Sequence, residues 1–380
     1  MHGGRIAGGA MKCGWSDGRA VLLVAVALLA AACSGGGGAE AGDSTPATSA
    51  PVTTPATSST STTTTVASTT TSSTTTTTLP ARFWDGLERL NILLLGSDAG
   101  VGRIGTRTDT MILASIDPAT GDAAMFSIPR NVTEAPLPEG MGLWDCNCFP
   151  DILTHLWANA EWYPDAFAGP QEPPVNALKA AVGLVFDLEI HYYAKVDLEG
   201  YVAMIDAVGG VTIEVPQRIV DESYPHELGG SEYVVIEEGT QHLDGHLGLA
   251  YSRIRRHSGD FARMHRQRCV LGALLDQTDL GDLIAGAADL AAAFEEHVAT
   301  DIPVEALPDL LLLASRMDLD RLATLRITSY NYGASGHAGY QLYDLERLRE
   351  DAKALIADPT THLDTQDGEG FRATCELSFD

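Results

Sequence analysis

Residues 91–98 read NILLLGSD, and this stretch decides the class of fold that the chain can adopt. The residues from Ile92 to Leu95 are all large and aliphatic, and Gly96 ends the run. A short, uninterrupted apolar run that ends at a glycine is typical of a strand buried on both faces. Sheets built of such strands are covered by helices on both sides, so the stretch predicts the centre of an α/β domain.

Two more apolar runs follow, at residues 111–116 and 123–128, and the turn sequence DPATGD at residues 117–122 separates them. Aspartate, proline and glycine between two apolar runs predict a hairpin, because these residues suit the backbone of tight turns. The chain therefore opens its folded part with three predicted strands.

Charged side chains mark the ends of these strands. Asp98 ends the first strand, Arg107 and Asp109 precede the second, and Arg130 follows the third. Such strand ends are favoured positions for ligand contacts in α/β sheets. Two carboxylates on neighbouring loops can hold Mg²⁺, which completes its shell with phosphate oxygens and water. The alternative is that Asp98 caps a turn and that Asp109 pairs with Arg107.

The rest of the folded part alternates between predicted helices and strands. A helix at residues 198–208 lies between strands at 191–196 and 211–215, which is the order of a βαβ unit. Residues 217–238 are predicted to be an insertion with a short strand at 233–236. Further helices are predicted at residues 151–161, from Pro173 onward, and at 244–251, 262–277, 282–296, 304–315 and 344–357, with a last strand at 323–328.

An arginine-rich stretch, YSRIRRHSGDFARMHRQR at residues 251–268, stands out from the composition. It holds six arginines and one acid, Asp260, although the chain has 24 Lys+Arg against 51 Asp+Glu and a net charge of −27. The arginine fork suits bidentate contacts with phosphate oxygens and keeps its charge when partly buried. The stretch predicts a pocket for a compact polyanion, with a solvated helix face as the alternative.

Helical spacing sorts the second half of this stretch into two faces. Arg263, Arg266 and Gln267 are predicted to lie near one face. The apolar positions of the same helix are predicted to face the core; they are Val270, Leu271 and Leu274.

Composition and missing patterns exclude several classes of function. A net charge of −27 argues against binding nucleic acid, which requires a cationic surface. The absence of a G-x-S-x-G sequence argues against a serine hydrolase of the α/β type. His242 and His246 have the spacing of a helical metal pair, but no glutamate follows His242 and no third ligand is evident, so metal binding by this pair is not predicted.

The N-terminal part has the pattern of an exported lipoprotein. Basic residues precede an apolar run at residues 20–32, which is shorter than the roughly 20 residues that cross a bilayer. The run ends in three alanines before Cys33, so residues 1–32 are predicted to be a signal peptide and Cys33 the lipidated first residue. An ordinary secretory signal or a retained membrane anchor are the alternatives.

Three segments follow the predicted signal peptide. Residues 33–82 are rich in Ser and Thr and nearly free of large apolar residues, which predicts a disordered tether. Residues 83–360 can form one α/β domain, and residues 361–380 are an acidic tail. The domain and tail hold Cys146, Cys148, Cys269 and Cys375. Export predicts two disulfides with three possible connectivities, and a zinc site of four thiolates is the alternative.

Six blocks of sequence, taken in order, carry a resemblance to a known family. They are NILLLGSD at 91–98, RTDTMIL at 107–113, SIPRN at 127–131, DAVGGVTIEVP at 206–216, LDGHLGLAYSRIR at 243–255 and DFARMHRQRCVL at 260–271. Together they resemble the LytR-CpsA-Psr family of cell-wall phosphotransferases. The resemblance implies a three-layer α/β/α sandwich around a mixed central sheet, with an apolar tunnel for a polyprenyl chain.

The same resemblance implies a reaction and its partners. The enzyme would move a glycopolymer from a polyprenyl-pyrophosphate carrier onto a sugar hydroxyl of peptidoglycan, at the extracytoplasmic face of the membrane. A surface protein as acceptor, or a non-catalytic protein that binds the polyprenyl lipid or the wall, are the alternatives. The chain departs from the family in having Asn131 where an aspartate is usual, and in its predicted lipid anchor where many members have a membrane helix.

Site residues carry over by position. Asp98 and Asp109 match the acids associated with Mg²⁺, for which Mn²⁺ can substitute. The resemblance gives five arginines contact with the pyrophosphate: Arg107, Arg130, Arg253, Arg255 and Arg263. Asp260 and Gln267 match two further polar positions. If the reaction needs a general base, Asp109 or Asp260 could serve, but an oxygen that binds the metal cannot also act as the base.

Overall fold

The computed structural model describes residues 82–99, 106–226, 230–255, 259–277, 296–314, 316–317, 322–334 and 342–358. The predicted signal peptide, Cys33, almost all of the tether and the acidic tail lie outside these residues, as does the predicted helix at 282–296 apart from its last residue. Within the described ranges, no helix is long and apolar enough to cross a membrane.

The three predicted strands are confirmed as β1 (Leu90–Ser97), β2 (Thr108–Ile116) and β3 (Ala123–Ser127). β1 pairs antiparallel with β2, and β2 pairs antiparallel with β3, so the predicted hairpin is also confirmed. A register shift between Gly96 and Ser97 interrupts the first pairing just before Asp98. A Cβ on Gly96 would lie 2.9 Å from the Cβ of Thr110, so glycine permits the close approach of the two strands there.

Three more strands complete a mixed six-stranded sheet in the order β11-β6-β1-β2-β3-β12. β6 (Tyr192–Val196) runs parallel to β1, and β12 (Ala323–Arg326) runs parallel to β3. β11 (Val298–Thr300) pairs antiparallel with β6 at the edge. The mixed sheet matches the predicted fold class.

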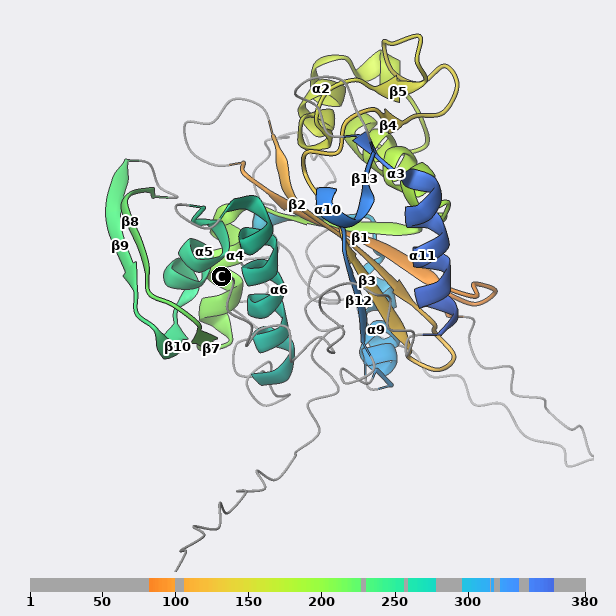
Figure 1. Ribbon diagram of the computed structural model, residues 1–380. Helices are drawn as coiled ribbons and strands as arrows, with labels where there is room; N and C mark the ends of the chain where they lie inside the picture. Colours follow the sequence, from red (N-terminus) through yellow and green to blue (C-terminus); the bar gives the residue numbers. More distant parts are fainter. Residues whose placement is uncertain are drawn as a thin grey trace, which may run out of the picture.

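Helices cover both faces of this sheet, as Figure 1 shows. On one face, alternate side chains of β1 and β2 pack into a core with α2 (Leu156–Trp162), α3 (Pro173–Phe186) and α11 (Leu345–Ala357). On the other face, Ile92 and Ile112 belong to a second core that includes α9 (Leu307–Ala314). The result is the expected α/β/α sandwich.

Three helices form a separate group on the side of the sheet opposite α3 and α11 (Figure 1). They are α4 (Leu198–Ala207), α5 (Gly245–Arg253) and α6 (Gly259–Gln277). Aspartates cap two of them: Asp197 accepts the amide hydrogen of Gly200, and Asp244 accepts that of Leu247. Each cap satisfies an amide that the first turn of the helix leaves without a partner.

The predicted βαβ unit is wrong. β7 (Val211–Val215) does not join the central sheet but pairs antiparallel with β10 (Gly239–Leu243) in a two-stranded sheet. Its side chains alternate between buried and exposed, with Thr212 and Glu214 on the exposed face. A strand with one solvated face suits a small antiparallel sheet, whereas a parallel central strand is buried on both faces.

The predicted insertion forms a hairpin of β8 (Ile219–Pro225) and β9 (Ser231–Ile236) beside α5. Cys146 and Cys148 are joined by a disulfide. Cys375 lies outside the described residues, so the second disulfide stays a prediction. The remaining short elements are β4 (Ala135–Pro136), β5 (Cys148–Phe149), η2 (Leu153–His155), η3 (Pro164–Phe167), η4 (Val304–Ala306), α10 (Ser329–Tyr332), β13 (Gly333–Ala334) and β14 (Leu342–Tyr343).

Candidate active site

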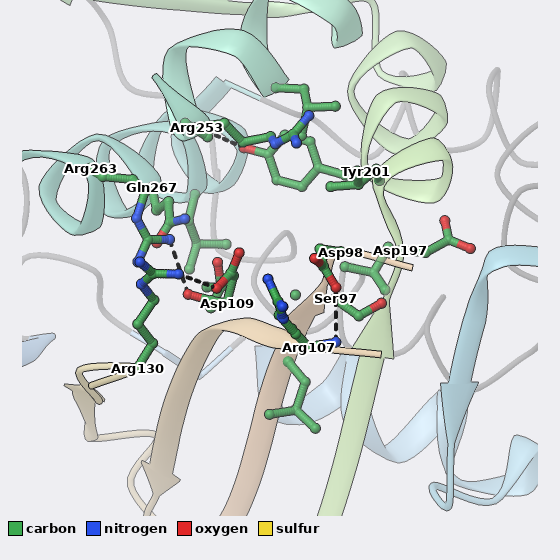
Figure 2. A pocket seen from close by; sticks show the side chains of 18 of the residues that line it. Ser97, Asp98, Arg107, Asp109, Arg130, Asp197, Tyr201, Arg253, Arg263 and Gln267 are labelled. Carbon is green, nitrogen blue, oxygen red and sulfur yellow. Dashed lines mark hydrogen bonds and ion pairs between the residues drawn. The ribbon is translucent and has the colours of Figure 1, made fainter. Parts of the chain in front are cut away.

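A cavity of about 540 Å³ lies between the central sheet and the group of α4, α5 and α6, with β8 at its rim. Eight of the nine predicted site residues line it: Asp98, Arg107, Asp109, Arg130, Arg253, Arg255, Arg263 and Gln267. Figure 2 shows how most of them surround one end of the cavity. Asp260 lies in the first turn of α6, and its side chain is outside what the structure describes.

Asp98 is buried directly after β1 and bonds to Arg107, which directly precedes β2. Its Oδ1 accepts the amide hydrogen of Arg107 at 2.8 Å, and its own amide donates to the Arg107 carbonyl at 3.0 Å. These two hydrogen bonds join the end of β1 to the residue before β2. They hold the Asp98 carboxylate at the cavity wall.

Asp109 is the point on which three arginines converge. Its Oδ1 accepts a hydrogen bond of 2.8 Å from Arg130 Nη1. Its Oδ2 is 3.7 Å from Arg255 Nη2, and its backbone carbonyl accepts a hydrogen bond of 3.0 Å from Arg263 Nη1. The alternative pairing of Asp109 with Arg107 is wrong, because Arg130 and Arg255 are its partners. Figure 2 shows Arg130 and Arg263 both directed at this carboxylate region.

These charges set the ionisation of Asp109. Burial alone would raise the pKa of this carboxyl. The hydrogen bond and charge of Arg130, together with the charges of Arg255 and Arg263, more than offset burial, so the pKa lies below its ordinary value. Asp109 is therefore an anion at neutral pH and a weak proton acceptor.

Arg253 belongs to the same cavity but is held by a different wall. Its Nη1 donates to the Tyr224 hydroxyl at 3.2 Å and to the Pro225 carbonyl at 3.4 Å, and its guanidinium lies over the Tyr224 ring at 5.4 Å. The β8–β9 hairpin thus positions Arg253 apart from the Asp109 cluster, as Figure 2 shows. Of the five predicted arginines, Arg130, Arg255 and Arg263 contact Asp109.

Arg266 does not share the cavity face with Arg263 and Gln267, contrary to the prediction. It is buried, and its guanidinium donates to the carbonyls of Tyr251 and Ile254 at the end of α5. These carbonyls lie at a helix end, where backbone acceptors need partners. Arg266 therefore stabilises the junction of α5 with α6.

Arg268 does not line the cavity either and is only 2% exposed. Arg256 lies outside the described residues. An alanine at Arg268 would leave an unfilled space in the interior and destabilise the fold. Arg268→Ala is therefore unsuitable as a control variant in tests of the cavity arginines.

The cavity continues from its charged end into an apolar region. Two of the helix positions predicted to face the core, Leu271 and Leu274, line this region, whereas Val270 is fully buried as predicted. The other apolar lining residues include Leu94, Ile112, Ala194, Val196 and Met204. A ligand with an anionic head and a hydrocarbon chain would match both parts.

The lining residues that reasoning from the sequence missed include Asp197, Tyr201, Asp221 and Tyr224. Tyr201 and Ser252 join α4 to α5 through a contact of 2.7 Å between their hydroxyl oxygens, and burial raises the pKa of Tyr201. Aromatic residues in an amphipathic pattern usually indicate core packing, so the pattern held no signal for these tyrosines. Asp197 caps α4, and an aspartate at the start of a helix is common without any role in a site.

The donor set at the charged end fits a hard divalent cation. Asp98 and Asp109 present carboxylate oxygens from neighbouring strand ends to one cavity. Mg²⁺ commonly binds one or two carboxylates and takes its remaining ligands from phosphates and water.

Comparisons with a family profile and with individual relatives agree with the family resemblance of the sequence blocks. The LytR_cpsA_psr family profile matches residues 52–355. A polyisoprenyl-teichoic acid–peptidoglycan teichoic acid transferase, TagU of Oceanobacillus iheyensis, is 34% identical over 230 residues, which are 59% of this chain and 62% of the relative. TagV of Bacillus subtilis, a transferase of the same description, is 28% identical over 279 residues, 72% of this chain and 64% of the relative. The chain thus spans a little under two thirds of these relatives.

Solved structures share the fold. The crystal structure of B. subtilis TagV superposes with a TM-score of 0.52 at 25% identity, covering 71% of this chain and 98% of that one. Protein gbs0355 from Streptococcus agalactiae superposes with a TM-score of 0.55 at 22% identity, covering 71% and 89%. Since the family profile covers most of the chain, this protein belongs to the LytR_cpsA_psr family.

Proposed function

We propose that this chain transfers a glycopolymer from a polyprenyl-pyrophosphate carrier to a sugar hydroxyl of peptidoglycan. One observation carries the proposal: Arg130, Arg255 and Arg263 gather around Asp109 at the charged end of a cavity whose other part is apolar. A pyrophosphate head and a polyprenyl chain match these two parts. The relatives named as peptidoglycan teichoic acid transferases support the choice of donor and acceptor.

The reaction would exchange one phosphorus–oxygen bond for another. The acceptor hydroxyl attacks the phosphorus that carries the glycopolymer, and the bond from that phosphorus to the bridging oxygen breaks. Polyprenyl phosphate leaves with the bonding electrons, and the hydroxyl proton is released. Negative charge grows on the phosphoryl oxygens during this exchange, and fixed arginines stabilise such charge without having to reorganise.

Each group of residues would have a separate task. Arg130, Arg255 and Arg263 would hold the phosphoryl group, and Arg253 would contact the head from the side of the hairpin. Asp98 and Asp109 would hold Mg²⁺, which when bound supplies further positive charge at the pyrophosphate. The apolar lining would fix the polyprenyl chain along α6.

Asp109 is better suited to hold a cation and position arginines than to accept the hydroxyl proton. Its pKa lies below the ordinary value because the surrounding arginines outweigh burial. An efficient general base has a pKa near the working pH, and a depressed carboxylate is far from it. We therefore propose that Asp109 holds the cation and positions the arginines, and that it does not accept the proton of the hydroxyl.

The site of action would be the outer face of the cytoplasmic membrane. A lipid on Cys33 and a tether at residues 33–82 would place the domain where the polyprenyl carrier and the wall meet. The relatives described above are named for a peptidoglycan acceptor. Their names give no support to a surface protein as acceptor or to a non-catalytic binding protein.

A reconstituted transfer assay tests the function. Full-length protein in detergent is mixed with a polyprenyl-pyrophosphate-linked oligosaccharide, peptidoglycan fragments and Mg²⁺. Mass spectrometry is expected to find the oligosaccharide linked by a phosphodiester to a peptidoglycan sugar, with release of an equal amount of polyprenyl monophosphate. Release of no polyprenyl phosphate, with or without the acceptor, would refute the proposal.

A further inference from the structure

A cluster of three side chains lies outside the cavity, between the β8–β9 hairpin and α5. His226 follows β8, Glu232 is in β9, and His246 is in the first turn of α5. One potential metal-binding atom from each of the three lies within 4.8 Å of the other two. In Figure 1 the hairpin lies on the side of α4, α5 and α6 that faces away from α3 and α11. The cluster is distinct from Asp98 and Asp109.

One close contact within the cluster does not have hydrogen-bond geometry. Glu232 Oε1 is 2.7 Å from His246 Nε2, yet among the described residues this buried oxygen accepts no hydrogen bond. The rings of His226 and His246 stack with their centroids 5.2 Å apart and their planes 26° from parallel. One nitrogen of each ring already lies within 4.8 Å of the other and of a carboxylate oxygen, although the rings must rotate for all three atoms to face one ion.

We propose that His226, Glu232 and His246 form a Zn²⁺ site. Zinc binds imidazole nitrogens and carboxylate oxygens at about 2.0–2.2 Å, and sites with two histidines and one glutamate keep a fourth position for water. Imidazole ligands favour zinc over Mg²⁺, which prefers oxygen donors only. Modest side-chain rotations would bring the three atoms to the separation that one ion requires.

The ion would connect the hairpin to the active-site helix. The ring of His246 lies 6.1 Å from that of Tyr224, and the Tyr224 hydroxyl accepts the hydrogen bond from Arg253. The carbonyl of Pro225, next to His226, accepts a second hydrogen bond from Arg253. Zinc at this position would fix β8 against α5 and so hold Arg253 in the cavity wall. This task is positional, and the site stands whether or not the proposed transfer reaction is correct.

Calorimetric titration of ZnCl₂ tests the site. The full-length protein is purified in detergent without a histidine tag, stripped with chelator, and titrated in millimolar Mg²⁺ so that oxygen-donor sites are filled. One zinc per chain is expected to bind saturably. His226→Gln, Glu232→Gln and His246→Gln are each expected to weaken binding at least tenfold, because each removes one ligand.

Two control variants separate this site from other binding. His242→Gln removes a histidine that contacts Thr212 and lies four residues from His246 but outside the cluster. Asp98→Asn alters the active-site acid. Both are expected to bind zinc like the wild type. Co²⁺ in place of zinc is expected to give the intense visible bands of a four-coordinate site, and these bands are expected to vanish in His246→Gln.

Folding is checked for every variant by circular dichroism and by melting with and without zinc. Zinc is expected to raise the melting temperature of the wild type and of His242→Gln, but not of the three ligand variants. The proposal is overturned if the wild type shows no saturable binding. It is equally overturned if folded Glu232→Gln and His246→Gln bind zinc as tightly as His242→Gln does.

Discussion

Oδ1 of Asp109 and Nη1 of Arg130 are 2.8 Å apart, although 21 residues separate them in the chain. The hairpin of β2 and β3 creates this contact, because it brings the start of one strand beside the end of the next. Arg255 and Arg263 reach the same aspartate from the end of α5 and from α6. Asp109 thus holds arginines from the central sheet and from the α5–α6 region in place before a ligand binds.

The ion pair predicts a pH dependence of stability. The pKa of Asp109 is lower in the folded state than its ordinary value of about 3.9, so its contribution is present above about pH 4 and is lost as pH falls through the folded pKa. Asp109→Asn is expected to lower the free energy of unfolding by about 1–3 kcal/mol at pH 7. In urea unfolding, the gap between wild type and variant is expected to shrink below pH 4. A gap that does not change with pH would contradict the assignment.

Asp98 is predicted to set the requirement for Mg²⁺. Asp98→Asn keeps an oxygen that can accept the Arg107 amide, but it removes the charge that a hard cation needs. The Mg²⁺ concentration for half-maximal transfer is expected to rise at least tenfold. Asp85→Asn serves as the matched control, since Asp85 is exposed and its carboxylate accepts the backbone amide of nearby Arg82. An unchanged Mg²⁺ requirement in folded Asp98→Asn would remove this residue from the metal site.

The apolar lining is predicted to recognise the polyprenyl chain. Leu274→Asn replaces a leucine of the cavity lining by a polar amide, so the polyprenyl chain loses an apolar contact. The loss is expected to weaken binding of the substrate by about 1.5–3 kcal/mol, which would raise KM about ten- to a hundredfold. The loss is expected with a long-chain substrate and not with one whose chain is a few carbons long. Leu184→Asn, at an exposed position of α3, is the control. Equal effects on long and short substrates would mean that the chain lies elsewhere.

The anchor is predicted to be a lipid on Cys33. Cys33→Ala is expected to leave the precursor unprocessed or to release the protein from membranes, because lipid attachment and cleavage both require the thiol. N-terminal analysis of the mature protein from membranes measures this directly. A mature chain that begins at any other residue would exclude the lipoprotein pattern.

The sequence predicted the parts of the fold that local patterns determine. Apolar runs located β1, β2 and β3, and Asp244 and Asp344 mark the starts of α5 and α11. The pairing of β7 with β10 was missed because alternation shows that one face is buried but does not identify the partner strand. Such pairing depends on contacts between residues distant in the chain.

The site residues also divide into those that local sequence patterns reveal and those that depend on contacts between distant parts of the chain. Asp98, Arg107 and Asp109 could be placed beside one another because apolar runs showed where β1 ends and where β2 begins. The role of Arg266 could not be predicted, because helical spacing assigns a face but does not show that the carbonyl end of α5 lies opposite that face. The backbone carbonyls of Tyr251 and Ile254, to which Arg266 donates, are present in every residue type and so cannot be recognised from the sequence.

The central claim is that the arginines around Asp109 stabilise the transferring phosphoryl group. Arg255→Ala tests it most directly, because the Arg255 side chain is 39% exposed and its removal leaves no buried gap. Arg218→Ala is the matched control, since Arg218 is an exposed arginine paired with Glu237 outside the cavity.

The measurement is the rate of transfer from a polyprenyl-pyrophosphate donor by folded protein at saturating Mg²⁺. Arg255→Ala is expected to lower the rate by about a hundred- to a thousandfold, or about 3–4 kcal/mol of transition-state stabilisation. Arg218→Ala is expected to stay within about twofold of the wild type. A folded Arg255→Ala protein with full activity, or one no slower than Arg218→Ala, would contradict the claim.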